Sequence, residues 1–248
     1  MNVEVFVMRL IQFLAFLAAV LLPTVAAAGD KNGAGSTGFY WNWGSLVGAC
    51  NGDCATTAFA GQQTSQTMQS VIGIADFTQG EFGFVPVVPI WEWPWDDSGF
   101  FAATYSRRIG SFGHAEVGEV VSFEAEMGIG QRWGIQTETE LWGAIYVRWH
   151  LFPWNHRVKT TIGISSGLNW ASGISDWEVH RSGNEEGSQL LHYLSPEITL
   201  AWPKNPNFEV LARFHHRSGG SDMFGPNSIF NNTGSGSQYF LLGTRYRF

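Results

Sequence analysis

A regular alternation of apolar and polar side chains over residues 138–151 is the feature that most constrains the fold of this chain. Leu141 and Ile145 belong to the apolar set at odd positions, whereas Glu140 and Arg148 belong to the polar set at even positions. Because successive side chains of a β-strand point to opposite faces, a period of two places every charge on one face. The segment therefore predicts a strand that separates an apolar environment from a polar one.

Alternation of this kind recurs along the chain from about residue 84 to the C-terminus. In hydrocarbon, backbone groups must be paired within the protein, and for strands only a closed barrel achieves this. The pattern therefore predicts an all-β fold, an eight-stranded antiparallel transmembrane β-barrel, which is the smallest barrel class. The expected strands lie near 84–93, 100–109, 117–131, 138–151, 158–168, 190–202, 208–217 and 238–248.

The composition agrees with a protein that has one wet and one apolar face. Charged residues make up 14% of the chain and aromatic residues 15%, with 12 Trp and 30 Gly. Soluble domains carry about a quarter charged residues, so the low charge favours a barrel whose outer wall meets lipid. The net charge of -7 argues against a nucleic-acid partner, which would require a basic surface.

The N-terminus predicts export. Arg9 precedes an apolar run over 10–22, and small residues up to Ala28 form an A-x-A cleavage site, so residues 1–28 are expected to be a secretory signal peptide. The run is shorter than the roughly 20 residues of a spanning helix. A start at Met8 would give a more ordinary signal peptide than a start at Met1. Together with a barrel, export predicts the outer membrane of a Gram-negative bacterium.

Residues 29–82 are rich in Gly, Ser, Thr, Gln and Asn and show no sustained period. They are expected to form a polar N-terminal extension, periplasmic or loop-like, before a barrel domain at 83–248. Cys50 and Cys54 lie in a polar turn of this extension, and an exported chain with this spacing favours a local disulfide. A zinc site would need further His or Cys ligands that the neighbouring sequence lacks.

The connections between the expected strands indicate the topology. Segments 152–157 and 203–207 are short, whereas 171–189 and 219–237 are long and polar. Short turns belong on the periplasmic side of outer-membrane barrels and long loops outside. An even number of strands returns the C-terminus to the periplasm, where the terminal Phe248 is typical of a signal for the outer-membrane assembly machinery.

The polar faces of the expected strands gather several charges. A network of ion pairs that fills a narrow barrel is favoured over a chemical role for them, and a filled lumen disfavours a pore. These lumen-facing charges are Glu124, Glu126, Glu138, Glu140, Arg148, Arg213 and Arg217.

The last two expected strands depart from the barrel pattern. Continuing the apolar phase of Phe214 leads to His216 and Ser218, and the apolar phase of the next strand leads to Gln238. The outer ends of two antiparallel neighbours are adjacent, so the three side chains are expected to meet on the lipid-facing wall. Ser218 would then be a nucleophile, His216 its base and Gln238 the group that orients the imidazole. His215 has the opposite phase and is expected to face the lumen. The alternative is a polar girdle at a strand end.

Residues 214–220, Phe-His-His-Arg-Ser-Gly-Gly, together with 236–248, Gly-Ser-Gln-Tyr-Phe-Leu-Leu-Gly-Thr-Arg-Tyr-Arg-Phe, resemble the C-terminal signature of the PagL-type lipid A deacylases. The resemblance extends over about 100–248 and does not include the N-terminal extension. Three further segments resemble the acyloxyacyl-hydrolase-like branch of that family: 123–126, 148–154 and 167–170.

This resemblance implies an ester hydrolase that removes the 3-O-linked 3-hydroxyacyl chain of lipid A, a lipopolysaccharide component of the outer leaflet, with no metal or cofactor. It assigns the catalytic roles to His216, Ser218 and Gln238. Gly219 occupies a position where the family often has Asn, so the backbone N–H groups of Gly219 and Gly220 are expected to hold the oxyanion. A neutral Gln238 would support the imidazolium less well than a carboxylate and implies slow turnover. A non-enzymatic structural or adhesion barrel is the alternative function.

Overall fold

The computed structural model describes residues 38–73, 86–182, 187–219, 229–230, 233 and 236–248. The expected signal peptide, the remaining parts of the expected extension and Gly220 lie outside the described residues.

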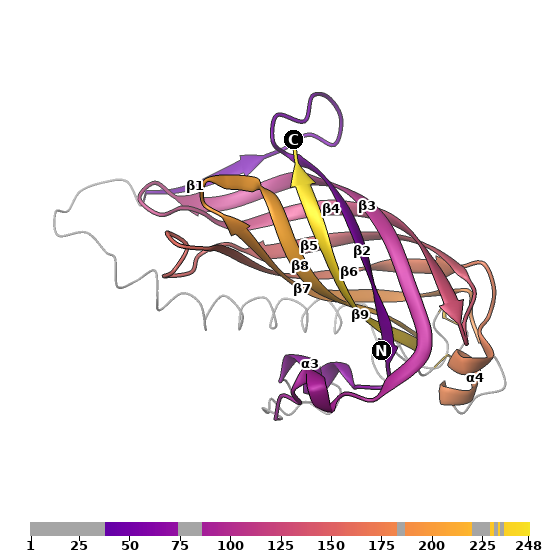
Figure 1. The fold of residues 1–248 in the computed structure, drawn as a ribbon. Helices are drawn as coiled ribbons and strands as arrows, with labels where there is room; N and C mark the ends of the chain where they lie inside the picture. Colours follow the sequence, from indigo (N-terminus) through magenta and orange to yellow (C-terminus); the bar gives the residue numbers. More distant parts are fainter. Residues whose placement is uncertain (1–37, 74–85, 183–186, 220–228, 231–232, 234–235) are drawn as a thin grey trace, which may run out of the picture. The chain divides into compact units, whose positions relative to one another are not determined.

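Eight antiparallel strands close into a ring, which confirms the predicted fold class (Figure 1). Each strand pairs with the next along the chain, and the first strand of the ring, β2, also pairs with the last, β9. This pairing leaves no free edge in the ring and satisfies the backbone groups within it. The ring contains β2 (Cys54–Thr64), β3 (Trp95–His114), β4 (Gly118–Gly134), β5 (Thr139–Trp149), β6 (Lys159–Ala171), β7 (Leu190–Trp202), β8 (Asn205–Ser218) and β9 (Gly236–Arg247).

The barrel begins earlier than the sequence suggested, because β2 lies within the expected polar extension. Thr57 and Phe59 face the lumen, whereas Thr56, Ala58 and Ala60 face outward, so the two faces of β2 differ little in hydropathy. A strand of this kind gives almost no alternation signal. The extension therefore contributes a strand that pairs with both β3 and β9.

The strand predicted at 84–93 is wrong over its described part, 86–93, which contains the short 3-10 helix η2 (Ile90–Glu92) and no strand. Pro86, Pro89 and Pro94 explain the difference, because proline lacks the N–H that a paired strand donates. The barrel therefore has the predicted eight strands, but β2 is one of them and the segment 86–93 is not.

Besides η2, three elements of the described residues lie outside the ring. β1 (Phe39–Trp43) pairs with the last residues of β3, from Gly110 to His114. The short helices α3 (Met68–Ile72) and α4 (Asp176–Ser182) belong to the connections after β2 and β6. Within the described part of the chain, no helix has both the length and the apolar character needed to cross a membrane.

The two ends of the barrel differ in their connections. At the end that contains Phe248, here called the C-terminal end, the connections 115–117, 150–158 and 203–204 are short. At the opposite end, here called the loop end, residues 65–94, 172–189 and 219–235 form long connections. The connections predicted to be short and those predicted to be long lie at opposite ends, as expected, although the loop end also contains the short connection 135–138 between β4 and β5.

A disulfide joins Cys50 to Cys54, the first residue of β2, with 5.1 Å between the Cα atoms. The intervening Asn51 and Gly52 both have positive φ, and the Asp53 amide donates to the Cys50 carbonyl. Asn-Gly is the pair that best tolerates such a turn. The disulfide therefore closes a turn whose Asn-Gly sequence already favours the required backbone conformation.

The lumen is filled by charged and aromatic side chains. Arg213 donates to both Glu126 and Glu197, and Glu197 also accepts from Arg148 and Arg245. All seven charges predicted to face the lumen take part in ion pairs, with Glu138 paired to Arg132 at the edge of the network. The aromatic part of the filling includes Phe59, Phe100, Trp142, Tyr146, Tyr193 and Tyr239.

The outer wall is apolar along the length of the strands. A contiguous apolar surface of this extent is unfavourable in water and suited to hydrocarbon. Exposed members of this wall include Phe101, Met127, Ile129, Leu141, Ile145, Ile162, Leu168, Ile198, Leu200, Val210 and Leu242.

Candidate active site

The loop end of β8 presents polar side chains on both of its faces. His215 and Arg217 are fully buried in the lumen, whereas His216 and Ser218 lie half-buried on the outer wall. The strand keeps its period of two to its last residue, so His216 and Ser218 continue the apolar row of Val210. The predicted lumen orientation of His215 is confirmed.

His216 and Ser218 form a hydrogen bond on this wall, with 2.9 Å between His216 Nε2 and Ser218 Oγ. Residues two apart on a strand share a face, so the backbone of β8 alone brings the two side chains within reach. When the hydroxyl donates, the imidazole is placed to accept its proton. This is the arrangement of a nucleophile and its general base.

Gln238 on β9 is the direct cross-strand partner of His216. Its side chain is 6% exposed, and its amide oxygen has no hydrogen-bond partner among the described residues. The structure thus places Gln238 beside the imidazole without the predicted hydrogen bond between them. Register fixes the positions of the Cβ atoms, but the χ angles that aim a long amide remain free.

Two glycines allow the chain to approach the nucleophile closely. A Cβ on Gly219 would overlap the carbonyl oxygen of Thr233, and a Cβ on Gly236 would overlap the carbonyl oxygen of Arg217. An Asn at position 219 would therefore not fit this backbone. Gly236 is the direct partner of Ser218, so β9 brings no side chain to that side of the hydroxyl.

Sequence reasoning missed a second hydroxyl–imidazole pair on the same wall. His192 on β7 is the direct partner of Ser218, and its Nε2 lies 2.9 Å from the Oγ of Ser166 on β6. The signal was present, because His192 has the phase of Leu194 and Ile198 in the alternation of its strand. It is a polar residue in an apolar row, as His216 is.

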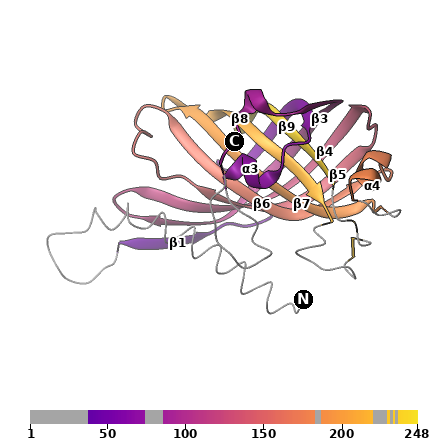
Figure 2. The same ribbon diagram turned by 90° about the horizontal axis from the view of Figure 1, so that it is seen from below.

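An aromatic cover lies next to the pair on β8. Trp93 packs edge to face on Phe214 and Phe240, with ring centroids 5.9 and 5.5 Å apart, and donates from its indole to the Val88 carbonyl at 2.8 Å. The described part of the connection between β2 and β3 thus lies over the outer faces of β8 and β9 (Figure 2).

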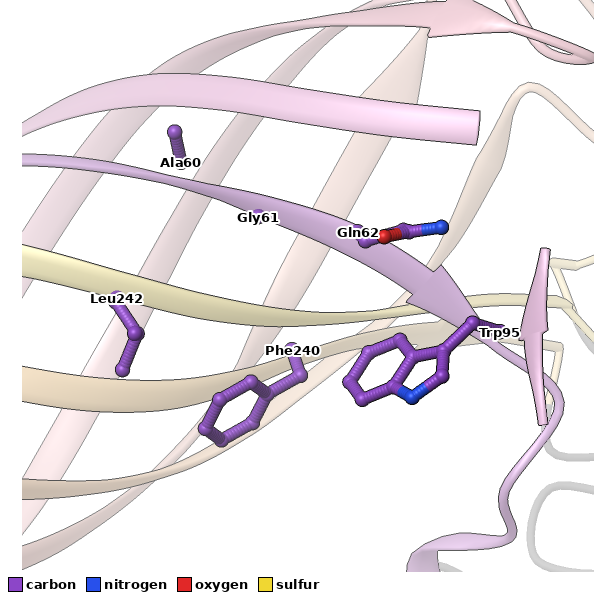
Figure 3. A pocket seen from close by; sticks show the side chains of 6 residues that line it. All are labelled: Ala60, Gly61, Gln62, Trp95, Phe240 and Leu242. Carbon is purple, nitrogen blue, oxygen red and sulfur yellow. The ribbon is translucent and has the colours of Figure 1, made fainter. Parts of the chain in front are cut away.

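An apolar cavity of about 220 Å³ opens on the outer wall between β2 and β9 (Figure 3). Phe240, which lines it, is two residues from Gln238 along the same face of β9, a spacing of about 7 Å. The cavity and the polar site therefore belong to one continuous surface. Its lining residues are Ala60, Gly61, Gln62, Trp95, Phe240 and Leu242.

Inside the barrel, His215 Nε2 donates to a carboxylate oxygen of Glu140 at 2.9 Å, and the ring lies among those of Phe100, Trp142 and Tyr193. Its contacts are those of a packed interior group. Over the described ranges, no three His, Cys, Asp or Glu side chains are grouped to hold a metal ion.

No protein-family model matches the chain, and no curated protein matches it. Among solved structures, the chain is similar to that described as "Crystal structure of the outer membrane enzyme PagL". The alignment has 13% identity and a TM-score of 0.47, and it covers 77% of this chain and 97% of that chain. A likeness of this size does not assign an activity.

Proposed function

We propose that this protein is an outer-membrane ester hydrolase that removes the 3-O-linked 3-hydroxyacyl chain of lipid A, with Ser218 as nucleophile and His216 as base. The observation that carries the proposal is the 2.9 Å hydrogen bond between these residues on the outer wall. Gln238, beside His216, is the candidate third member.

The position of the pair favours a substrate that is itself in the membrane. A polar group facing hydrocarbon costs free energy unless it is used or reaches the interface. The lumen is filled by ion pairs, so a polar substrate has no route to Ser218 through it. A lipid ester in the surrounding leaflet reaches the hydroxyl by lateral diffusion.

The reaction follows from the two side chains. Ser218 Oγ attacks the ester carbonyl carbon while His216 Nε2 takes the hydroxyl proton. The tetrahedral intermediate collapses as the bond to the sugar oxygen breaks, and His216 returns the proton to that oxygen. Water then attacks the acyl group on Ser218, again with His216 as base, and releases a 3-hydroxy fatty acid.

Two features support lipid A as the substrate class. The segments 214–220 and 236–248 resemble the signature of PagL-type deacylases, and the neighbouring apolar cavity offers a surface for an acyl chain. In this proposal the loop end lies at the outer leaflet, where lipopolysaccharide resides, and Phe248 lies on the periplasmic side for recognition by the assembly machinery.

The test is mass spectrometry of lipid A from cells that express the wild-type chain or Ser218→Ala. We expect the wild type, but not Ser218→Ala, to remove one 3-hydroxyacyl group. Ser122 is a matched control, because its Oγ lies 2.7 Å from His150 Nε2 at the C-terminal end of the barrel. Ser122→Ala is expected to behave as wild type. Unchanged lipid A with the folded wild-type barrel in the membrane would contradict the proposal and favour a structural or adhesion barrel.

A further inference from the structure

The proposed reaction needs a donor for the oxyanion, and the surroundings of Ser218 limit where a side chain could supply it. Of the two residues directly opposite Ser218, Gly236 on β9 has no side chain and no room for one. The other is His192 on β7. Side chains of directly opposite residues start about 4.5–5.5 Å apart at their Cβ atoms, so the side chain of His192 begins beside that of Ser218, and its Nε2 reaches toward Ser166 on β6.

His192 is held by Ser166, whose Oγ lies 2.9 Å from His192 Nε2. When the Ser166 hydroxyl donates to Nε2, the imidazole is neutral and carries its hydrogen on Nδ1. Its Nδ1–H can then donate a hydrogen bond, whereas its Nε2 accepts from Ser166 and does not serve as a base for Ser218. A serine that fixes the tautomer of a histidine is a positioning residue. Two hydroxyl–imidazole pairs thus stand side by side across β6, β7 and β8.

We infer that His192 is a further catalytic residue that donates an N–H hydrogen bond to the oxyanion formed when Ser218 attacks the ester, with Ser166 as its positioning residue. The inference rests on the proposed function. As the Ser218 Oγ–carbon bond forms, the carbonyl π electrons move to the oxygen, which becomes the oxyanion. His192 keeps its proton throughout, and the proton of Ser218 travels by His216 to the leaving sugar oxygen.

This assignment gives the site a side-chain donor although position 219 is a glycine that cannot be replaced by Asn on this backbone. A preorganised oxyanion donor in a site that excludes water contributes about 10²–10³-fold to kcat. A loss of kcat of this size can be distinguished from the small losses that altered packing would cause.

The experiment uses the full chain folded in phospholipid vesicles that contain 3-O-acylated lipid A, with the released 3-hydroxy fatty acid as readout. We expect His192→Ala to lower kcat by about 10²–10³-fold while KM changes by no more than about threefold. His192→Gln restores an N–H donor but not a base, and it is expected to recover at least tenfold of that loss. Ser166→Ala should lower kcat by roughly tenfold, and Ser166→Thr should restore it.

A control is available at the opposite end of the barrel, where Ser122 and His150 form a hydroxyl–imidazole pair on the lumen side. His150→Gln is expected to leave kcat and KM unchanged. If His192→Ala does not fold, the comparison of His192→Gln with His192→Phe supplies the same contrast between donor and no donor.

Three results would overturn the inference. One is a His192→Ala kcat within threefold of wild type, and another is a rise in KM alone. The third is a His192→Gln variant as inactive as His192→Ala, which would make His192 a base. If the wild type releases no fatty acid and a fluorophosphonate does not label Ser218, the proposed function fails and the inference fails with it. An active wild type with an unaffected His192→Ala variant overturns the inference alone.

Discussion

Two neighbouring histidines of β8 lie in opposite environments, one in the lumen and one on the outer wall. His215 points inward, is fully buried and lies 2.9 Å from Glu140 among three aromatic rings. His216 points outward, stays half-buried and shares its hydrogen bond with Ser218. Two consecutive residues of β8 therefore place one imidazole inside the protein and the other on its outer surface.

The difference shows that the polarity of a side chain does not reveal its role until its environment is known. In the lumen, polar groups are paired with one another, so their charges are satisfied and contribute to a packed interior. On the outer wall, the polar groups are few and surrounded by apolar residues. A polar group set in an apolar surface is the one to test for chemistry.

The largest expected effect concerns His216. His216→Asn removes the base but keeps a polar side chain of similar reach, and we expect kcat to fall by roughly 10⁴-fold or more, with the stability of the barrel unchanged. Fatty acid release by the protein in lipid A vesicles measures the first quantity, and urea unfolding measures the second. Retained activity in His216→Asn would break the comparison, because the outer histidine would then be as inert as the inner one.

The second effect belongs to the lumen. Glu197 accepts hydrogen bonds from Arg148, Arg213 and Arg245, so Glu197→Ala leaves buried guanidinium groups without their shared partner. We expect a loss of about 3–5 kcal/mol in the free energy of unfolding in lipid vesicles. Glu119→Ala is the control, because its ion pair with Arg108 is partly exposed and is worth about 0–1 kcal/mol. Equal losses in both variants would show that burial does not set the strength of these pairs.

The third prediction sharpens the contrast within β8. His215→Phe preserves a ring in the aromatic packing but removes the hydrogen bond to Glu140, and we expect it to cost about 1–3 kcal/mol of unfolding free energy. The kcat of the folded fraction should stay within threefold of wild type. A fall in kcat comparable to that of His216→Asn would assign the inner histidine to the chemistry as well.

The smallest effect comes from the neutral neighbour of His216. Gln238→Glu places a carboxylate opposite the imidazole, where it can form the hydrogen bond that the Gln238 oxygen does not make, and such a bond contributes about 1 kcal/mol. We expect kcat to rise by roughly fivefold, since 1 kcal/mol corresponds to that factor. Thr56→Glu on the outer wall of β2, at the C-terminal end of the barrel, is the control and should leave kcat unchanged. A lower kcat in Gln238→Glu would show that burial of the carboxylate outweighs its support of the imidazolium.

Most strands could be predicted because their two faces differ strongly in polarity. The strand expected at 190–202 coincides with β7, whose lumen face contains Tyr193 and Glu197 and whose outer face contains Ile198 and Leu200. β2 could not be found in this way, since Thr and Ala occupy both of its faces. The alternation signal depends on contrast and not on the presence of a strand.

The candidate site was predictable where it depended on phase alone. His216 and Ser218 lie on the outer wall as their parity indicated, and the register places Gln238 beside them. The position of His192 opposite Ser218 depends on the register between β7 and β8, which cannot be read from the sequence alone. The missing hydrogen bond to Gln238 depends on side-chain torsions, which neither parity nor register determines.

The seam between β2 and β9 has a consequence for how the barrel is assembled. Phe248 and Cys54 exchange backbone hydrogen bonds, and Arg245 donates to Thr57 across 188 positions of sequence. Joining segments so far apart requires the chain to lose the entropy of a very large loop, whereas the other strands pair with sequence neighbours. Closure of this seam is therefore the least local event in folding, and the chain must be synthesised to its last strand before the cylinder can seal.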